Sequence, residues 1–288
     1  MGRFDFFDRG MPGIDPQELK GKLIVIEGAD GVGRSTQILL LKQWLEIHGH
    51  AVLATRLTRS ALAGKGLRRA KKGTTLGRVT MMLFYATDFA DRMVREIIPA
   101  LKAGMVVLTD RYVYTLIARA MVRGIDPAWI RGVYGFALKP HSVFYLRAGV
   151  DDLVTRVLQQ GSFDYWESGM DLHLGDDMYE SFVEYQKRII GRFDKMVEDY
   201  GFRVIDASRS IEEIFIDLKA QMSELLNADR ELAGDPRARS KPGRNERSAR
   251  ESSQQETGES NLRYASYGPA DDRAVELRRD PLVPLVGT

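Results

Sequence analysis

The sequence predicts an α/β fold in which helices flank a parallel β-sheet. Two observations carry this prediction: five short apolar runs recur along the chain, and helical patterns separate them. A third is a glycine-rich turn, "EGADGVGRSTQ" at 27–37, which directly follows the first run. The runs are continuously apolar, as strands buried on both faces of a parallel sheet should be. They cover residues 23–27, 51–55, 105–110, 142–146 and 202–206.

Each helical pattern between the runs carries a start signal, an end signal or an apolar stripe. Gly49 ends the first helix as a favourable C′ residue, and Pro99 should kink the last turn of the long second helix. Asp126 precedes a proline as an N-cap, while Ser210 and Glu213 form a capping box. The predicted helices cover 35–48, 76–102 and 179–200, and two more begin after Asp126 and Ser210.

Composition narrows the class of protein. The chain has 288 residues, 44% of them hydrophobic, and no cysteine, which excludes disulfides and thiolate sites. A net charge of +2 is too small to indicate a nucleic-acid or membrane partner. No apolar run reaches the roughly 18 residues of a spanning helix, and the first residues lack a secretory apolar region. The sequence therefore predicts a cytoplasmic protein.

Three segments are predicted: an N-terminal extension at 1–19, a single domain at 20–226, and a charged tail at 227–288. In the extension, Phe4, Phe6 and Phe7 offer an apolar contact to the domain. The tail is rich in Arg, Glu, Ser and Gly, and its apolar content is too low to offset ordering entropy, so we expect disorder there. A docking peptide at "LVPLV" near the C-terminus is the alternative.

The turn at 27–37 nearly matches the phosphate-binding pattern G-x4-G-K-[S/T], with Arg34 in the lysine position. It also lies in the right context, between a strand and a helix. Backbone N–H groups of such a turn converge with the helix N-terminus on phosphate oxygens, and the hydroxyl of Ser35 would reach Mg²⁺. In parallel sheets, ligands bind beyond the carboxyl ends of the strands, where this turn lies.

Three further stretches fall at the same edge or beside it. Asp110 and Arg111 close the third run, and Arg56, with help from Arg59, follows the second as a phosphate anchor. Phe84 on the long helix would stack a base. Each has a structural alternative that stays open: a surface ion pair, solvated arginines, and an aromatic of the core.

Together these motifs resemble the thymidylate kinase family. They are E-G-x-D-G-x-G-x-S-T, T-R after the second run, L-F-x-A on the long helix, D-R-Y after the third run and a closing I-D-A. The resemblance covers about Gly21 to Leu226. It implies a P-loop NTPase fold with a five-stranded parallel sheet and a small lid, ATP as donor, Mg²⁺, and dTMP as acceptor. A homodimer through the long helix is left open, since core packing explains that helix equally well.

The resemblance also assigns roles to residues. Those on the ATP side are Gly28, Ala29, Asp30, Gly31, Val32, Gly33, Arg34, Ser35, Thr36, Arg156, Ala207 and Ser208. Those on the acceptor side are Asp30, Arg56, Phe84, Arg92, Asp110, Arg111 and Thr115. Arg34, Asp30 and Arg111 would be catalytic, and Ser35 and Asp110 would hold the metal.

Several positions depart from the family pattern. The helix arginine expected after L-F-x-A falls on Asp88, with Arg92 one turn further on the same face. The lid pattern D-R-x-E reads Asp164-Tyr165-Trp166-Glu167, so the lid arginine is absent, and Gly31 stands where other members carry a loop arginine. The family's Tyr-Gln has become Arg119-Ala120. A replacement cation would come from Arg59, Arg92 or Arg119.

The sequence therefore predicts a nucleoside monophosphate kinase of nucleotide biosynthesis that converts dTMP to dTDP with ATP. Two alternatives remain: a kinase of the same fold with a different nucleotide or phosphorylated acceptor, and a nucleotide-binding regulatory module without catalysis. The altered acceptor positions favour the first alternative, and the missing lid arginine favours the second. For Arg34 the hypothesis is an adapted clamp, whose planar fork spans neighbouring phosphate oxygens.

Overall fold

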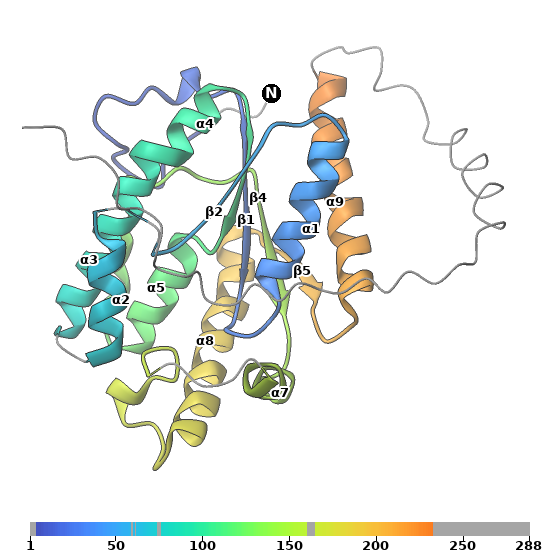
Figure 1. The fold of residues 1–288 in the computed structure, drawn as a ribbon. Helices are drawn as coiled ribbons and strands as arrows, with labels where there is room; N and C mark the ends of the chain where they lie inside the picture. The colour runs from blue at the N-terminus through green and yellow to red at the C-terminus, as the bar shows by residue number, and fades with distance from the viewer. Residues whose placement is uncertain (1–3, 59, 61, 74–75, 160–164, 233–288) are drawn as a thin grey trace, which may run out of the picture. The chain divides into compact units, whose positions relative to one another are not determined.

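A computed structural model describes residues 4–58, 60, 62–73, 76–159 and 165–232. Five strands form one parallel sheet in the order β2-β3-β1-β4-β5 (Figure 1). They are β1 (Lys22–Gly28), β2 (Val52–Arg56), β3 (Val106–Asp110), β4 (Ser142–Arg147) and β5 (Arg203–Asp206). The predicted α/β fold with a five-stranded parallel sheet is confirmed, and the strand bounds differ from the predicted runs by one residue at most.

The register of the sheet gathers the ends of three strands at one edge. Ile26 of β1 lies opposite Asp110 of β3, and Arg56 of β2 lies opposite the same residue. Every residue of β1 and β3 is buried, because these strands are central and helices cover both faces. The turn after β1 therefore begins beside the charged residues that close β2 and β3.

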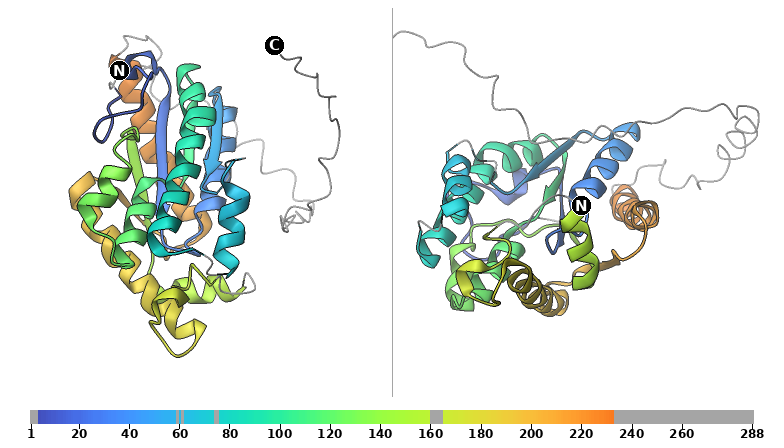
Figure 2. Two further views of the ribbon diagram at one scale, coloured as in Figure 1. Left: turned by 90° about the vertical axis from the view of Figure 1, so that its left-hand side faces the viewer. Right: turned by 60° about the horizontal axis from the view of Figure 1, so that its bottom comes forward.

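The sheet separates two apolar clusters. On one face, Ile24 and Ile26 of β1 pack with α1 (Arg34–Ile47) and α9 (Ile211–Leu232). On the other face, Leu23 and Val25 pack into a larger cluster. That cluster includes α3 (Arg78–Arg92), α4 (Ile98–Lys102), α5 (Val113–Val122) and α8 (Met178–Tyr200). Figure 2 shows these two helical layers on opposite sides of the sheet.

The helix predicted at 76–102 is divided into three parts. Between α3 and α4 lies a π-helical turn, Met93–Ile97, and Pro99 is the second residue of α4. Proline has no N–H to donate, so a regular helix cannot run through it unchanged. The distortion therefore lies just before Pro99, rather than as a kink in the last turn.

Local end signals are confirmed at two other helices. Asp126 accepts a hydrogen bond from the N–H of Trp129 at 2.7 Å, and Ser210 and Glu213 bond each other's backbone N–H reciprocally. The remaining helices are α2 (Gly64–Gly73), α6 (Pro127–Val133), α7 (Val150–Gln159) and short 3₁₀ turns at Pro16–Glu18 and Met170–Leu172. No helix in the described ranges is both long and apolar enough to cross a membrane.

The N-terminal extension packs on the domain from Phe4 onward. Phe4 and Phe6 are buried, and Phe6 forms an isolated bridge with Leu138. At the other end, α9 continues to Leu232 and so includes the first residues of the predicted tail. The rest of that tail, with "LVPLV", lies outside the described residues.

Candidate active site

The turn after β1 depends on glycine at two close approaches. Gly28 has φ +150°, and a Cβ there would lie 2.6 Å from the carbonyl oxygen of Leu146. Gly31 has φ +82°, and its Cβ would meet Val157 Cγ2 at 2.6 Å. Both the left-handed backbone and the lack of space require glycine. The turn then enters α1 and holds backbone N–H groups toward the carboxyl edge of the sheet.

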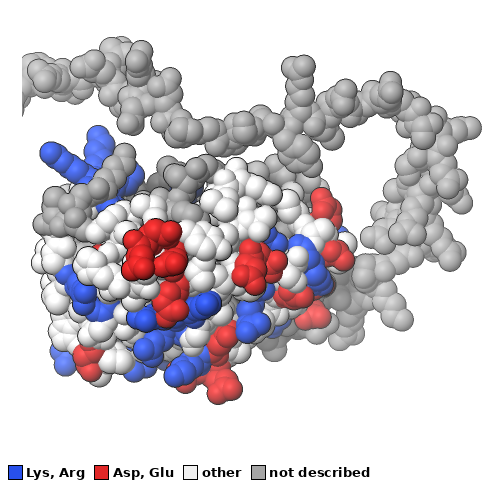
Figure 3. All heavy atoms as spheres, turned by 90° about the horizontal axis from the view of Figure 1, so that it is seen from below, with Lys and Arg blue, Asp and Glu red and all other residues white. Residues whose placement is uncertain are grey.

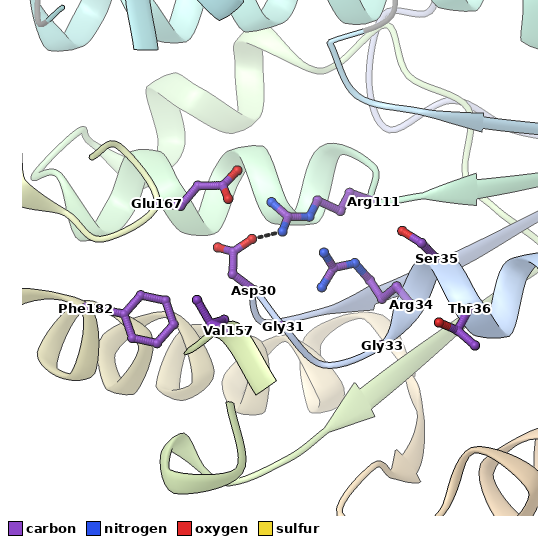
Figure 4. A pocket seen from close by; sticks show the side chains of 10 residues that line it. All are labelled: Asp30, Gly31, Gly33, Arg34, Ser35, Thr36, Arg111, Val157, Glu167 and Phe182. Carbon is purple, nitrogen blue, oxygen red and sulfur yellow. Dashed lines mark hydrogen bonds and ion pairs between the residues drawn. The ribbon is translucent and has the colours of Figure 1, made fainter. Parts of the chain in front are cut away.

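A pocket of about 340 Å³ opens beside this turn (Figure 4). Its lining residues are Asp30, Gly31, Gly33, Arg34, Ser35, Thr36, Arg111, Val157, Glu167 and Phe182. A second pocket, of about 350 Å³, shares Gly31, Gly33 and Thr36 and extends toward Arg156 and Ile211. The predicted loop thus lies between two pockets. On the face of the molecule seen in Figure 3, acidic and basic side chains are mixed.

Arg34 bonds inward to protein groups. Its Nε donates to Asp110 Oδ1 at 2.8 Å, and its Nη1 donates to the carbonyl oxygens of Gly28, at 2.6 Å, and Ala29. Only Nη2 has no hydrogen-bond partner among the described residues. The clamp hypothesis expects two nitrogens of the fork to face phosphate, but only Nη2 remains free of bonds to described protein groups. The fork ties the loop to the end of β3 and leaves one nitrogen for a ligand.

Ser35 and Asp110, the predicted metal ligands, contact each other. Ser35 Oγ donates to Asp110 Oδ2 at 2.8 Å. A hydroxyl and a carboxylate are the hard oxygen ligands that Mg²⁺ takes, alongside water and substrate phosphate. No cluster of three acidic or histidine side chains exists within the described ranges, so the fit is to an ion held mainly by its substrate.

Asp30 is the meeting point of the acceptor side. It pairs with Arg111, and its Oδ2 accepts from Arg119 Nη2 at 3.1 Å and from Gln186 Nε2 at 3.3 Å. Arg111 has φ +69°, which costs a non-glycine residue about 1 kcal/mol. Burial lowers the pKa of Arg111 to about 10, and repulsion from Arg119 acts in the same direction. Two guanidinium groups therefore converge on one carboxylate.

Glu167, from the predicted lid, closes the other side of this charge cluster. Its Oε1 pairs with Lys71 of α2 at 3.0 Å and with Arg119 at 3.4 Å. Burial alone would raise the pKa of Glu167, but Arg119, Lys71 and Arg111 outweigh that effect and hold the pKa well below its ordinary value. Glu167 is therefore a carboxylate anion over the pocket.

Arg123 fixes the segment that carries Glu167. Its guanidinium pairs with Asp171 at 3.0 Å, donates to the carbonyl oxygen of Trp166 at 2.8 Å, and lies 3.6 Å from the centre of that ring. Tyr185 of α8 also bonds Arg123. The part of the lid from Tyr165 to Leu172 is thus anchored to α5 and α8.

Thr115 lies behind the loop rather than on the pocket wall. Its hydroxyl donates to Glu27 Oε2 at 2.5 Å, while the N–H of Tyr112 donates to Glu27 Oε1 at 2.8 Å. Glu27 is fully buried, and burial raises its pKa against these bonds. The hydroxyl proton of Thr115 is thus already used by the buried glutamate, and contact of Thr115 with the acceptor stays a prediction.

Arg92 and Asp88 differ from the expected arrangement. The Arg92 side chain is fully buried and bonds Thr55 Oγ1 at 3.4 Å, so it lies outside the described pockets. Burial lowers the pKa of Arg92, which the nearby Asp88 opposes. Asp88 accepts the backbone N–H groups of Thr58 at 2.9 Å and Ser60 at 3.1 Å. Asp88 therefore holds the chain that follows β2, and Arg92 contacts β2 itself through Thr55.

The outer acceptor residues lie apart from this cluster. Arg56 is exposed at the end of β2, opposite Asp110 in the sheet register. Phe84 is 37% exposed on α3 and lines neither of the two pockets, so base stacking by Phe84 stays a prediction. Arg59 lies outside the described residues.

On the ATP side, the predicted adenine residues do lie together. Arg156 Nη2 donates to the carbonyl oxygen of Ala207 at 2.9 Å, and its Nη1 donates to that of Val32 at 3.3 Å. Arg156 also lines the second pocket. Ser208 is exposed, its hydroxyl donates to Asp206, and it does not line the second pocket.

Fold and loop together define a P-loop α/β protein whose glycine-rich loop lies at the carboxyl edge of the sheet. A model of the family "Thymidylate kinase" matches residues 26–217. "Probable thymidylate kinase 2" of Saccharolobus solfataricus is 38% identical over 73% of this chain and 99% of its own length. The "Probable thymidylate kinase" of Pyrococcus horikoshii is 31% identical (72% and 98%), and the "Thymidylate kinase" of Bifidobacterium longum is 32% identical (72% and 100%). The chain belongs to the thymidylate kinase family, and the predicted resemblance is confirmed.

Sequence reasoning missed part of the charge cluster. Lys71 and Gln186 come from α2 and α8, and no local motif connects them to the loop. Arg119 was visible only as a departure from the family's Tyr-Gln motif. Glu167 was visible only as the glutamate that the lid pattern D-R-x-E retains. Their proximity follows from the packing of α5 and α8 against the sheet.

Proposed function

We propose that the chain transfers the γ-phosphoryl group of ATP to dTMP and releases ADP and dTDP. The observation that carries the proposal is one pocket lined both by the glycine-rich loop and by Arg111, which directly follows β3. The first group suits a donor phosphate and the second an acceptor phosphate. The names of the relatives support the same reaction.

On the donor side, the loop's N–H groups and Arg34 Nη2 would bind the β- and γ-phosphates, while Arg156 would lie against the adenine. Ser35 and Asp110 would hold Mg²⁺ together with the donor's phosphates. When bound, Mg²⁺ neutralises part of the negative charge on those phosphates. Arg34 would also keep the loop rigid through Gly28.

On the acceptor side, Arg56 and Arg111 would hold the phosphate of dTMP, and Phe84 would stack on thymine. An oxygen of that phosphate forms a bond to the γ-phosphorus. The bond between the γ-phosphorus and the β,γ-bridging oxygen breaks, and its electron pair leaves with ADP. Such transfer depends on alignment and on neutralising charge rather than on a protein nucleophile.

The cytoplasmic location and the homodimer stay predictions.

A coupled ADP-release assay over a panel of nucleoside monophosphates tests the proposal. We expect a monophosphate-dependent rate with dTMP or dUMP as the best acceptor. Ser35→Ala, which removes a proposed metal ligand, should lower that rate. Ser223→Ala on α9, where the half-buried hydroxyl bonds only the carbonyl oxygen of Lys219 in its own helix, should not. If no monophosphate raises ADP release above the ATP-only background, the proposed function is wrong.

A further inference from the structure

We propose that Arg119 of α5 binds the acceptor phosphate, and that Glu167 is the carboxylate from which Arg119 is released when the acceptor binds. The inference rests on the proposed function, since it adds a cation to the same acceptor site. Two positions motivate it. Asp88 on α3 and Tyr165 in the lid stand where the family pattern has arginines, so this site lacks two expected positive charges.

Arg119 is buried, yet much of its hydrogen-bonding capacity is unused. Its side chain is 4% exposed. Its Nη2 alone makes every hydrogen bond of the guanidinium group, to Asp30 at 3.1 and 3.3 Å and to Glu167 at 3.4 Å. The Nε and Nη1 groups have no partner within the described part of the chain. Among the described residues, neither atom belongs to the fully enclosed side-chain atoms that lack a partner. Both therefore keep some access from outside, and a ligand that supplies acceptors could bond them.

The position of Arg119 suits an anion in the pocket. Asp30 and Glu167, the two carboxylates that it bonds, both line the pocket beside the loop (Figure 4). Arg111 shares Asp30 Oδ1 with Arg119. A phosphate placed next to Arg111 would therefore lie within a short side-chain movement of Arg119.

Charge counting supports the same ligand. Three cations, Lys71, Arg111 and Arg119, meet two carboxylates, Asp30 and Glu167, in an alternating chain of contacts. The cluster carries a surplus of one positive charge in a partly desolvated place. Burial and then repulsion from Arg119 lower the pKa of Arg111, while Glu167 and Glu27 act in the opposite direction. Phosphate, which binds guanidinium groups through paired hydrogen bonds, has the charge and shape to offset that repulsion.

Glu167 is the carboxylate from which Arg119 is released in this proposal, because a second cation already pairs with it. The bond from Arg119 to Glu167, at 3.4 Å, is longer than the bond from Arg119 to Asp30 Oδ2. Glu167 also pairs with Lys71 at 3.0 Å. Because Lys71 remains, releasing Arg119 does not leave a buried carboxylate unpaired, which would be expensive.

The test compares binding of dTMP with binding of thymidine, the same nucleoside without phosphate, by titration calorimetry on the full chain. Arg119→Gln should raise the Kd for dTMP at least about tenfold, the loss typical of a charged hydrogen bond, and leave the Kd for thymidine within about twofold. The matched control is Arg188→Gln on α8, an exposed arginine paired with Glu184, which should change neither Kd.

A structural role for Arg119 predicts a different result: both Kd values would rise by the same factor, and the proposal would be overturned. An unchanged Kd for dTMP would overturn it as well. If Arg119→Gln does not fold, Arg119→Lys keeps the charge without the fork and should weaken dTMP binding alone, by about threefold or more. A wild-type chain that neither binds dTMP nor releases ADP with it would refute the proposed function. If the wild type is active but substitution of Arg119 leaves the Kd for dTMP unchanged, only this proposal is refuted.

Discussion

The side of the pocket proposed for the donor's phosphates comes from one short stretch of chain and the end of a neighbouring strand, whereas the proposed acceptor side is assembled from distant segments. Gly28 to Thr36 supply nearly all of this donor-phosphate side, with Asp110 added from β3, and Arg156, proposed for the adenine, comes from α7. The acceptor side brings together the loop, α2, the β3–α5 junction, the lid and α8. The donor side is therefore encoded locally and the acceptor side by tertiary packing.

The difference shows how the two sides tolerate change. On the donor side a single substitution, Arg34 for lysine, is absorbed by bonds to Asp110 and to the loop's own carbonyl groups. On the acceptor side, Asp88 has taken up backbone N–H groups, and Arg119 has joined Asp30 from another helix. Charge lost at one position of the acceptor side is matched by charge gained at another.

The largest effect should come from breaking the donor side at Asp110. Asp110→Ala removes the partner of both Arg34 Nε and Ser35 Oγ, and leaves a buried arginine short of its counter-charge. Loss of one partner of a buried pair typically costs about 3–5 kcal/mol of unfolding free energy. Urea unfolding would measure it. The control is Asp5→Ala, which removes an exposed partner of Lys139 and should cost far less unfolding free energy.

Equal losses for the two aspartate variants would contradict the central place given to Asp110. A large loss of stability with unchanged ATP-dependent activity would separate its structural role from metal binding.

Substitution of Arg34 tests how the donor side binds ATP. Arg34→Ala should weaken ATP binding by roughly 1.5–3 kcal/mol, the range for charged hydrogen bonds. Arg34→Lys should lower turnover, because one ammonium group cannot replace a fork that bonds Asp110 and two loop carbonyls. ATP affinity and steady-state turnover give both values. A lysine variant as active as the wild type would show that arginine here is a neutral replacement.

These cases show what the sequence could and could not predict. The strands and the loop were predictable because each depends on a few adjacent residues: an apolar run, or Gly28 and Gly31 at close approaches. Arg92 was placed correctly on its helix, but its full burial against Thr55 of β2 depends on tertiary packing that no local motif shows. The bond from the Thr115 hydroxyl to Glu27 could not be predicted, because it depends on Glu27 being buried beside α5.

Phe84→Ala tests the acceptor side alone. Loss of aromatic stacking on a base typically costs about 1–3 kcal/mol, so dTMP binding should weaken while ATP binding stays unchanged. Phe84 is exposed enough that truncation should leave the fold intact. Calorimetric titration of the variant with each nucleotide measures the difference. Equal weakening of both ligands, or of neither, would mean that Phe84 is not part of the acceptor site.

The smallest effect concerns the pH dependence of the acceptor-side cluster. The folded state lowers the pKa of Glu167, so its ion pairs stabilise the fold above the ordinary carboxyl pKa of about 4.3, and this contribution is lost as the pH falls toward the folded-state value. Glu167→Gln should therefore lower the unfolding free energy by about 1 kcal/mol near neutral pH. The difference from the wild type should shrink as the pH drops below about 4. A difference that does not vary with pH would mean that charge at Glu167 is unimportant.

The most direct test of the whole account is to follow the phosphoryl group itself. ATP labelled with radioactive phosphorus at the γ-position is incubated with the chain, Mg²⁺ and dTMP, and the products are separated by chromatography. The account predicts that the label moves to dTDP in step with ADP release, and that omission of dTMP stops the transfer. Label found only in inorganic phosphate, or retained in ATP whatever monophosphate is present, would contradict it.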